Sequence, residues 1–170
     1  MRLALTIPAQ WLAPNFTAGG TFSGFLYQSD TYASIDPPHS VDSEVLFTTD
    51  DGILGGSYTD KSGQWHGFTM SGGTFKIYTY PEATDSFVVG VGPGAEVVGN
   101  WTDSSGAMHG FVNLGGAYYT IDKPGVSVTA ITAVSTKGSL VGNFTAGTVR
   151  NPKRFAFIAR CPAGQSPCTQ

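Results

Sequence analysis

Two histidines, His66 and His109, are the side chains best suited to chemistry in this sequence, and they lie 43 residues apart. Each precedes a Gly-Phe pair, so the two occupy equivalent places in a local pattern. Two imidazoles at equivalent positions could share a metal ion or pass a proton. Alternatively, each ring could bond a carboxylate of the preceding turn, Asp60 or Asp103. A histidine pair without further ligands is a weak metal signal, which favours the structural interpretation.

The aspartates Asp60 and Asp103 each begin a turn that ends in glycine, Asp60-Lys-Ser-Gly63 and Asp103-Ser-Ser-Gly106. An aspartate at this place accepts hydrogen bonds from main-chain amides further along the turn. Calcium would need several more oxygen ligands than one carboxylate provides. We therefore expect these aspartates to stabilise turns.

Three aromatic residues stand where the pattern does not require them. Trp65 aligns with Met108, Tyr80 aligns with Lys123, and Trp11 lies in a turn. Because the fold does not demand these rings, we expect them to be exposed. Sugar rings stack on exposed aromatic faces. Trp11, Trp65, Tyr80, His66 and His109 are therefore the candidate ligand-binding residues.

Recognisable catalytic motifs are absent from the sequence. It contains no Gly-x-Ser-x-Gly elbow and no His-Glu-x-x-His zinc motif. The segment Gly90-Val-Gly-Pro-Gly94 fits a turn between strands and offers no helix end to a phosphate. Asp36, Glu82 and Asp122 fit strand connections, so no pair of carboxylates can be assigned as acid and base. We therefore predict no catalytic residue, no cofactor and no metal.

The only two cysteines, Cys161 and Cys168, bracket a short loop near the end of the sequence. In an oxidising compartment a disulfide between them would hold down a short tail. Two thiolates without a nearby histidine or second cysteine pair would leave a tetrahedral metal site half built. A disulfide is therefore the favoured prediction.

The composition indicates one compact domain over residues 1–170. Hydrophobic residues make up 41% and charged residues only 12%, against roughly 25% charged in an ordinary domain. No apolar run is long enough to span a membrane. Every acidic residue lies at or before Asp122, and the last quarter is basic. A basic last module packing beside an acidic first one explains this better than a nucleic-acid patch, so we expect no nucleic-acid partner.

A repeat of 43 residues runs through the chain. Gly24-Phe25 recurs as Gly67-Phe68 and Gly110-Phe111, and a last copy, Ala156-Phe157, follows a small insertion. The same period relates Pro38, Pro81 and Pro124, and also Gly56, Gly99 and Gly142. One period kept by several residue types indicates a repeat architecture.

Each repeat is expected to hold four short strands, except that the fourth repeat has three clear strands and then the cysteine loop where its outer strand should be. The first is almost entirely apolar, as a strand buried on both faces requires: Leu3–Ile7, Val45–Phe47, Phe87–Val91 and Ala130–Val134. Hairpin turns follow at Thr49–Gly52, Gly92–Gly94 and Ser135–Gly138. The second strand carries an aromatic residue that we expect in the core between repeats: Phe16, Tyr58, Trp101 and Phe144. The third holds Gly-Phe, whose rings Phe25, Phe68, Phe111 and Phe157 should be buried.

One connection in each repeat is long and contains proline, which suits a segment that leaves the sheet: Asp36–Glu44, Pro81–Ser86 and Asp122–Val128. The predicted repeats are 1–37, 38–80, 81–123 and 124–170. On this division Leu3–Ile7 is a strand, so a signal peptide is not expected there.

Four-stranded meanders at this spacing are typical of β-propeller blades. We predict an all-β protein with a β-propeller of four four-stranded blades, closed alone or completed by a second chain in a larger ring. A β-sandwich is the main competitor, but a sandwich gives no reason for a fixed sequence period. The second form of closure would make the protein a homodimer.

The segments Thr59–Phe75 and Trp101–Phe111 resemble the bacterial extracellular repeats known by their His-Ala-Phe signature, with Gly67 and Gly110 in the alanine position. The first repeat has Ser23 and the last has Phe155 where the histidine would stand. The resemblance implies a secreted or surface-exposed β-repeat protein, and it carries no catalytic residues.

We therefore expect a non-catalytic binding or adhesion module, extracellular or on the cell surface, with a carbohydrate or protein ligand. The alternatives are a glycan-binding lectin that uses the exposed aromatic residues and a propeller-type hydrolase. Loops at the ends of blades are the expected binding surface.

Overall fold

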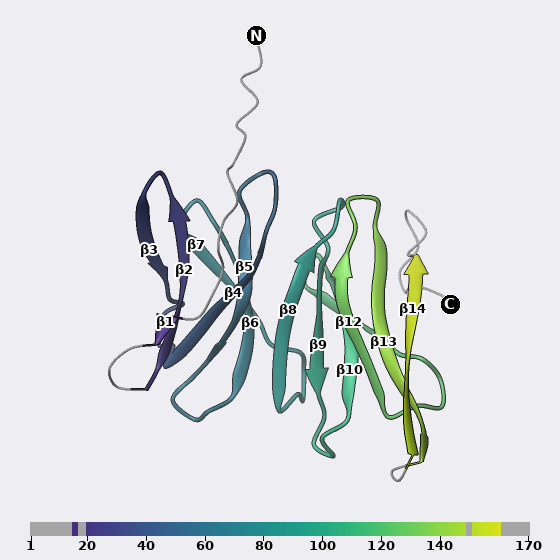
Figure 1. Ribbon diagram of the computed structural model, residues 1–170. Helices are drawn as coiled ribbons and strands as arrows, with labels where there is room; N and C mark the ends of the chain where they lie inside the picture. Colours follow the sequence, from purple (N-terminus) through teal and green to yellow (C-terminus); the bar gives the residue numbers. More distant parts are fainter. Residues whose placement is uncertain (1–14, 17–19, 149–150, 161–170) are drawn as a thin grey trace.

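The computed structural model describes residues 15–16, 20–148 and 151–160, and every regular element in these residues is a β-strand (Figure 1). This confirms the all-β prediction.

The strands form four consecutive groups, called units one to four here. Unit one holds β1 (Asn15–Phe16), β2 (Phe22–Gln28) and β3 (Thr31–Ile35). Unit two holds β4 (Asp42–Thr48), β5 (Leu54–Thr59), β6 (Trp65–Ser71) and β7 (Thr74–Tyr78). Unit three holds β8 (Asp85–Val91), β9 (Val97–Thr102), β10 (Met108–Leu114) and β11 (Ala117–Ile121). Unit four holds β12 (Val128–Val134), β13 (Ser139–Thr148) and β14 (Asn151–Arg160).

Units two and three are antiparallel meanders of four strands, as the repeat predicts. One parallel bridge, between Met108 and Val128, joins unit three to β12. The strand expected at Leu3–Ile7 lies outside the described residues, as does the cysteine loop that follows β14. The described units are therefore open sheets laid side by side along the chain (Figure 1).

The first strand of units two, three and four carries a bulge at the same place in each repeat. The pairing register shifts between Val45 and Phe47, between Val88 and Gly90, and between Ile131 and Ala133. A bulge strengthens the local twist of a strand. The 43-residue period therefore extends to a β-bulge, a backbone feature that no residue type in the sequence predicts.

The hairpin turns follow the prediction with one exception. Gly52 and Gly138 take positive φ angles of 84° and 77° and close their turns onto Thr49 and Ser135. In unit three the turn runs one residue further than expected, because Ala95 takes the positive φ of 61° and donates to Gly92. The expected Gly92–Gly94 turn is corrected to Gly92–Ala95.

The three junctions between units are built alike. At Gly24, Gly67 and Gly110 a Cβ atom would lie within 3.0 Å of the first strand of the next unit, at Val45, Val88 or Ile131. Glycine thus lets the third strand of one unit approach the first strand of the next. The repeated Gly-Phe pair therefore marks where the units meet.

Each unit has two faces, and the core lies between the rear face of one unit and the front face of the next. On the rear of unit three are Val98 and Val112, which pack with Ile131 and Leu140 on the front of unit four. The front face of unit three carries Val88 and Phe111, which pack against Tyr78 on the rear of unit two. Burial thus depends on having a neighbour on each side.

The prediction that four equivalent phenylalanines are buried holds for two. Phe68 and Phe111 are fully buried, whereas Phe25 and Phe157 are half-buried. Phe25 lies on the front face of unit one, which no earlier described unit covers. Phe157 lies on β14, which has no described strand beyond it.

Among the second-strand aromatics only Tyr58 is buried in the described core. Trp101 is half-buried beside Tyr80, and Phe144 is half-buried against Phe155 of its own unit, at a ring-centroid distance of 5.3 Å. Trp101 nevertheless packs against the core that units two and three share, so the interpretation as core between repeats holds for Tyr58 and Trp101 but not for Phe144. The side chain of Phe16 lies outside the described residues.

The connections that contain proline leave the sheets, but two of them end earlier than predicted. β4 begins at Asp42 and β8 at Asp85, inside the expected connections Asp36–Glu44 and Pro81–Ser86. The reason is that the Asp42 and Asp85 carboxylates accept hydrogen bonds from the main-chain N–H groups of Phe22 and Trp65. These bonds fix the start of each strand to the unit before it.

The described residues contain no helix that is long and apolar enough to cross a bilayer.

Candidate functional site

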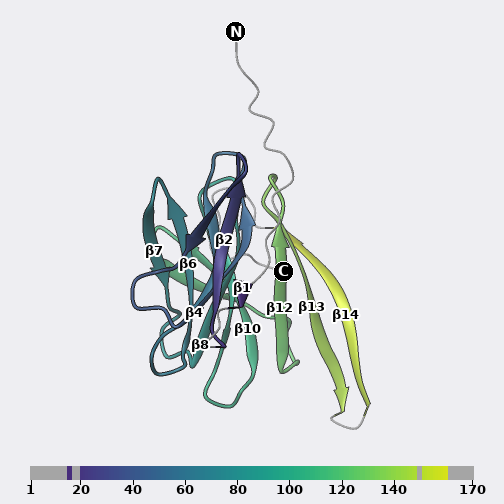
Figure 2. The same ribbon diagram turned by 60° about the vertical axis from the view of Figure 1, so that its left-hand side comes forward.

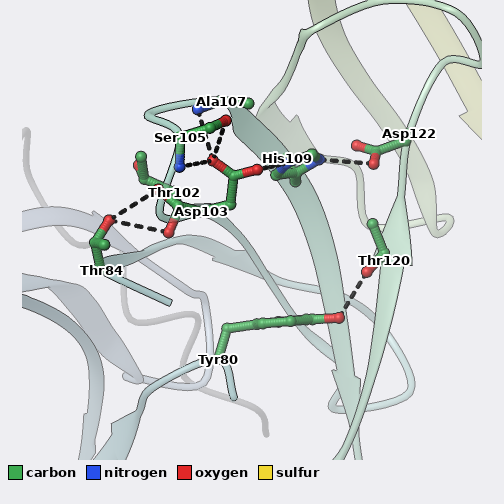
Figure 3. Close-up of polar contacts among 9 residues, drawn as sticks. All are labelled: Tyr80, Thr84, Thr102, Asp103, Ser105, Ala107, His109, Thr120 and Asp122. Carbon is green, nitrogen blue, oxygen red and sulfur yellow. Dashed lines mark hydrogen bonds and ion pairs between the residues drawn. The ribbon is translucent and has the colours of Figure 1, made fainter. Parts of the chain in front are cut away.

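The β9–β10 hairpin is organised by Asp103 (Figure 3). Its Oδ1 accepts hydrogen bonds from the N–H groups of Ser105 and Ala107 at 2.8 and 2.9 Å and from the Ser105 hydroxyl at 2.7 Å. The Gly106 N–H closes the turn onto the Asp103 carbonyl. Hydrogen bonding, first of all from the Ser105 side chain, lowers the pKa of Asp103 from 3.8 to about 2.

Asp60 plays the same part in the β5–β6 hairpin. Its Oδ1 accepts from the Ser62 N–H, the Ser62 hydroxyl and the Gln64 N–H. The Ser62 side chain and then His66 lower the pKa of Asp60 below its usual range. The expected turn-stabilising role of both aspartates is confirmed.

The second carboxylate oxygen of each aspartate faces a histidine. Nε2 of His66 lies 3.2 Å from Asp60, and Nε2 of His109 lies 3.5 Å from Asp103. The other ring nitrogens differ, because Nδ1 of His66 contacts the Thr79 hydroxyl at 2.9 Å and Nδ1 of His109 contacts Asp122 at 2.7 Å. Each histidine thus bridges two segments of its own unit: the aspartate turn before its strand and the connection that follows the outer strand.

An aromatic stack adjoins His109. The indole of Trp101 lies between the imidazole of His109, at a centroid distance of 4.5 Å, and the ring of Tyr80, at 4.2 Å and 5°. The Tyr80 hydroxyl lies 2.6 Å from the Thr120 hydroxyl (Figure 3). The Trp101 N–H is buried and has no hydrogen-bond partner among the described residues. Both faces of Trp101 are therefore occupied.

The connection from unit two is also tied to this hairpin. The Thr84 hydroxyl donates to the main-chain carbonyls of Thr102 and Asp103, at 3.1 and 3.4 Å (Figure 3). Tyr80 and Thr84 therefore anchor the same connection at two points on unit three. The cluster joins two units and holds their relative position.

Trp65 belongs to a different group of rings. Its indole lies 6.3 Å from the ring of Phe22 and 5.7 Å from that of Phe87, centroid to centroid. All three rings are half-buried, and they come from units one, two and three. We call them the Phe22–Trp65–Phe87 strip. The strip is partly covered, which corrects the expectation of a freely exposed Trp65.

The predicted ligand-binding residues therefore fall into two places. His109 and Tyr80 share the stack with Trp101, while Trp65 and His66 are neighbours on β6. Tyr80 is half-buried and stacked rather than free. Trp11 and both cysteines, with the predicted disulfide, lie outside the described residues.

Sequence reasoning missed the parts played by Asp122, Trp101 and Thr120. Asp122 stands 43 residues after Thr79, so the repeat replaces a hydroxyl with a carboxylate beside the second histidine. This difference between aligned positions was the signal that could have identified it. Trp101 was assigned to the core because aromatic residues recur at its position.

The arrangement Asp103–His109–Asp122 could hold a proton between two carboxylates, as imidazole–carboxylate pairs do in catalysis. However, both ring nitrogens already face oxygens of the fold. No group of three or more His, Cys, Asp or Glu side chains in the described part of the chain could hold a metal ion. The geometry therefore favours a structural role for the site.

The Asp103 turn should make folding sensitive to acid. Its pKa is about 2 in the folded protein against 3.8 as the ordinary value, so the unfolded chain takes up the proton first as the pH falls. The stabilisation is present above about pH 4 and is lost toward about pH 2. Asp103→Asn is expected to unfold at lower urea concentration at neutral pH and to lose less stability across that window. Equal losses for both proteins would contradict the assignment.

Comparison with known proteins adds no assignment to this geometry. No family model matches the sequence, and neither a curated protein nor a solved structure matches it.

Proposed function

We propose that this chain is a non-catalytic binding or adhesion module, secreted or displayed on the cell surface. The observation that carries this proposal is that each ring nitrogen of His66 and His109 faces an oxygen of the fold itself. A general base needs a ring nitrogen within reach of a substrate proton. The same bonding in two consecutive units supports a structural role for both histidines.

The architecture that we propose is a β-propeller of four four-stranded blades, with one blade in each unit, closed alone or completed by a second chain in a larger ring. Three junctions with equivalent glycines support it, because a repeated junction relates each unit to the next by a similar rotation. Rotations repeated about one axis lead to a ring of blades. In such a ring the loops at the ends of blades form the binding surface.

An extracellular location is supported by the resemblance of Thr59–Phe75 and Trp101–Phe111 to bacterial extracellular repeats. The hairpins at the centre of that resemblance are held by hydrogen bonds to Asp60 and Asp103. These carboxylates keep their charge to low pH.

A glycan-binding lectin is the second candidate, and the Phe22–Trp65–Phe87 strip favours it. The three rings come from three successive units, and the ring of Trp65 contacts the other two. Each remains partly exposed, and partly exposed rings are the usual stacking surface for sugars. The Asp85 carboxylate lies beside the strip, where it accepts a hydrogen bond from the main-chain N–H of Trp65 at 3.0 Å.

The test is to apply the purified protein to a glycan array and to an array of secreted and cell-surface proteins. Bound protein and released products are measured in the same wells. If the chain is a non-catalytic binding module, it should bind its ligand saturably and no product should be released. Trp65→Met is the matched variant, because the third unit already carries Met108 at this position. The variant should therefore fold like the natural chain.

If the ligand is a glycan, Trp65→Met should weaken binding about tenfold or more, because a flexible thioether replaces the stacking face. If the ligand is a protein bound elsewhere, the variant should bind like the natural chain, and the lectin candidate fails. Product release from any well would contradict the non-catalytic proposal. So would a lack of saturable binding on both arrays.

A further inference from the structure

The Phe22–Trp65–Phe87 strip is bordered by two carboxylates, each from the unit that follows a ring. Asp42 accepts a hydrogen bond from the main-chain N–H of Phe22 at 2.9 Å, and Asp85 accepts one from that of Trp65 at 3.0 Å. Both acidic side chains are half-buried. The first two residues of the strip thus each have a carboxylate beside them.

Ring and carboxylate are lost together one repeat later. Met108 stands at the position of Trp65, and Val128 stands at the position of Asp85. Units three and four are joined at this place by a parallel backbone bridge between Met108 and Val128. A junction between units therefore forms without an aromatic ring and without a carboxylate, so joining units does not explain why the strip has both.

Glu44 brings a third carboxylate to the strip. On β8, Asp85 and Phe87 are two residues apart, and both contact Trp65. Asp42 and Glu44 have the same spacing on β4, and they are the counterparts of Asp85 and Phe87 one repeat earlier. Side chains two residues apart lie on the same face of a strand. The repeat therefore places Glu44 beside the first ring of the strip, as Phe87 lies beside the second.

The carboxylate of Glu44 is without a partner in the described part of the chain. Its side chain is half-buried, yet it makes no hydrogen bond and no ion pair with a described residue. Burial raises the pKa of Glu44. An ionised group that is partly removed from water is stabilised by a partner of opposite charge. A ligand cation beside Glu44 would supply that partner.

The border of the strip carries negative charge that the described chain does not neutralise. No lysine or arginine of the described residues forms an ion pair with any of the three carboxylates. Lys61 lies at the same end of unit two, in the turn after β5, and is exposed. Figure 1 and Figure 2 both show β14, which carries Lys153 and Arg154, at the edge of the array away from β2 and β4. A ligand of complementary charge is therefore cationic.

We propose that the strip binds an extended segment of a partner protein in which arginine occupies alternate positions. A guanidinium group over an aromatic face is attracted by the ring, and its planar fork also pairs with a carboxylate. Alternate side chains of an extended chain stand about 6.6 Å apart. The neighbouring ring centroids of the strip are 6.3 and 5.7 Å apart, so successive arginines reach successive rings.

This inference rests on the proposed binding function and names the ligand of the strip. A neutral sugar would stack on the same rings and bond its hydroxyls to the carboxylates, which is the lectin candidate. It would leave the negative charges of the border without a counter-charge, whereas arginine side chains neutralise them. The charge of the ligand therefore separates the two candidates.

The first test measures, by fluorescence anisotropy, the binding of a labelled peptide of alternating arginine and serine that is blocked at both ends. The matched peptide carries citrulline in place of arginine, which keeps the shape of the side chain but not its charge. The arginine peptide should bind saturably, about tenfold or more tightly than the citrulline peptide, and more weakly as salt is added. Absence of binding, or equal binding of both peptides, would overturn the proposal. Saturable binding of another ligand on the arrays would then leave the binding function standing.

The second test locates the peptide on the strip by substitution. Trp65→Met, Glu44→Gln and Asp85→Asn should each raise the dissociation constant of the arginine peptide about threefold or more, because each removes a ring or a charge that faces the ligand. The asparagine in Asp85→Asn can still accept the Trp65 N–H, and Glu44 has no side-chain hydrogen bond to lose among the described residues. These two variants should therefore fold like the natural chain.

Asp50→Asn is the matched control for the charge. It removes one negative charge from the exposed turn after β4, at the opposite end of that strand from Asp42. Its affinity for the arginine peptide should equal that of the natural chain. Equal weakening by Asp50→Asn would show attraction to the overall charge of the protein, and unchanged binding by the strip variants would show contact elsewhere. Either result would overturn the proposal.

Discussion

Replacing Phe68 with alanine is expected to lower the free energy of unfolding by about 3–5 kcal/mol. The ring is fully buried and packs with Val45, Leu54 and Tyr58 in the core that units one and two share. Removing it leaves a cavity lined by strands that cannot collapse, because each is fixed in its sheet. Urea denaturation followed by tryptophan fluorescence gives the change.

Phe25→Ala is the matched control, because Phe25 occupies the same place in unit one but is half-buried. It should cost less than half as much, because the Phe25 ring is already partly in contact with water in the folded protein. Similar losses for the two variants would mean that unit one is covered as fully as unit two. A loss below about 0.5 kcal/mol for Phe68→Ala would place that ring outside the core.

Gly67→Ala is expected to destabilise the protein by about 1–3 kcal/mol, although it adds a single methyl group. The new Cβ would lie 2.5 Å from Val88 Cγ2 and 2.9 Å from the Val88 main-chain nitrogen. The backbone contact cannot be relieved by a change of rotamer, so units two and three must move apart. Calorimetry or chemical denaturation measures the loss.

The control for this variant is Ala156→Gly. Ala156 occupies the equivalent place on β14 but is exposed and meets no further unit among the described residues. Its replacement should change the free energy of unfolding by no more than about 1 kcal/mol, the ordinary cost of glycine in a strand. If Gly67→Ala proved as mild, the junction glycines would have no packing role.

The period of 43 residues was sufficient to predict the four strands each of units two and three, because turns and apolar strands recur with it. It also identified Gly67 and Gly110 as positions with a common role, which the junctions explain. It failed at the ends of the array. Phe25 and Phe157 match Phe68 in sequence, yet their burial depends on which neighbours are present, and a repeat pattern does not encode that.

The candidate site was predicted only in part. The bonds from His66 to Asp60 and from His109 to Asp103 were among the sequence-based alternatives, since six residues separate each pair across one hairpin. Asp122 is much further along the chain, on the connection after the outer strand. Its approach to His109 depends on the register of β10 and β11, which the sequence specifies only through the finished sheet.

The likeness of the three junctions also bears on how such a chain can change in length. Gly24 meets Val45 much as Gly67 meets Val88, so each unit offers its neighbours nearly the same pair of surfaces. Duplication or loss of one segment of 43 residues would therefore join surfaces that already fit. Longer and shorter arrays can arise by recombination between copies, without any new contact having to evolve.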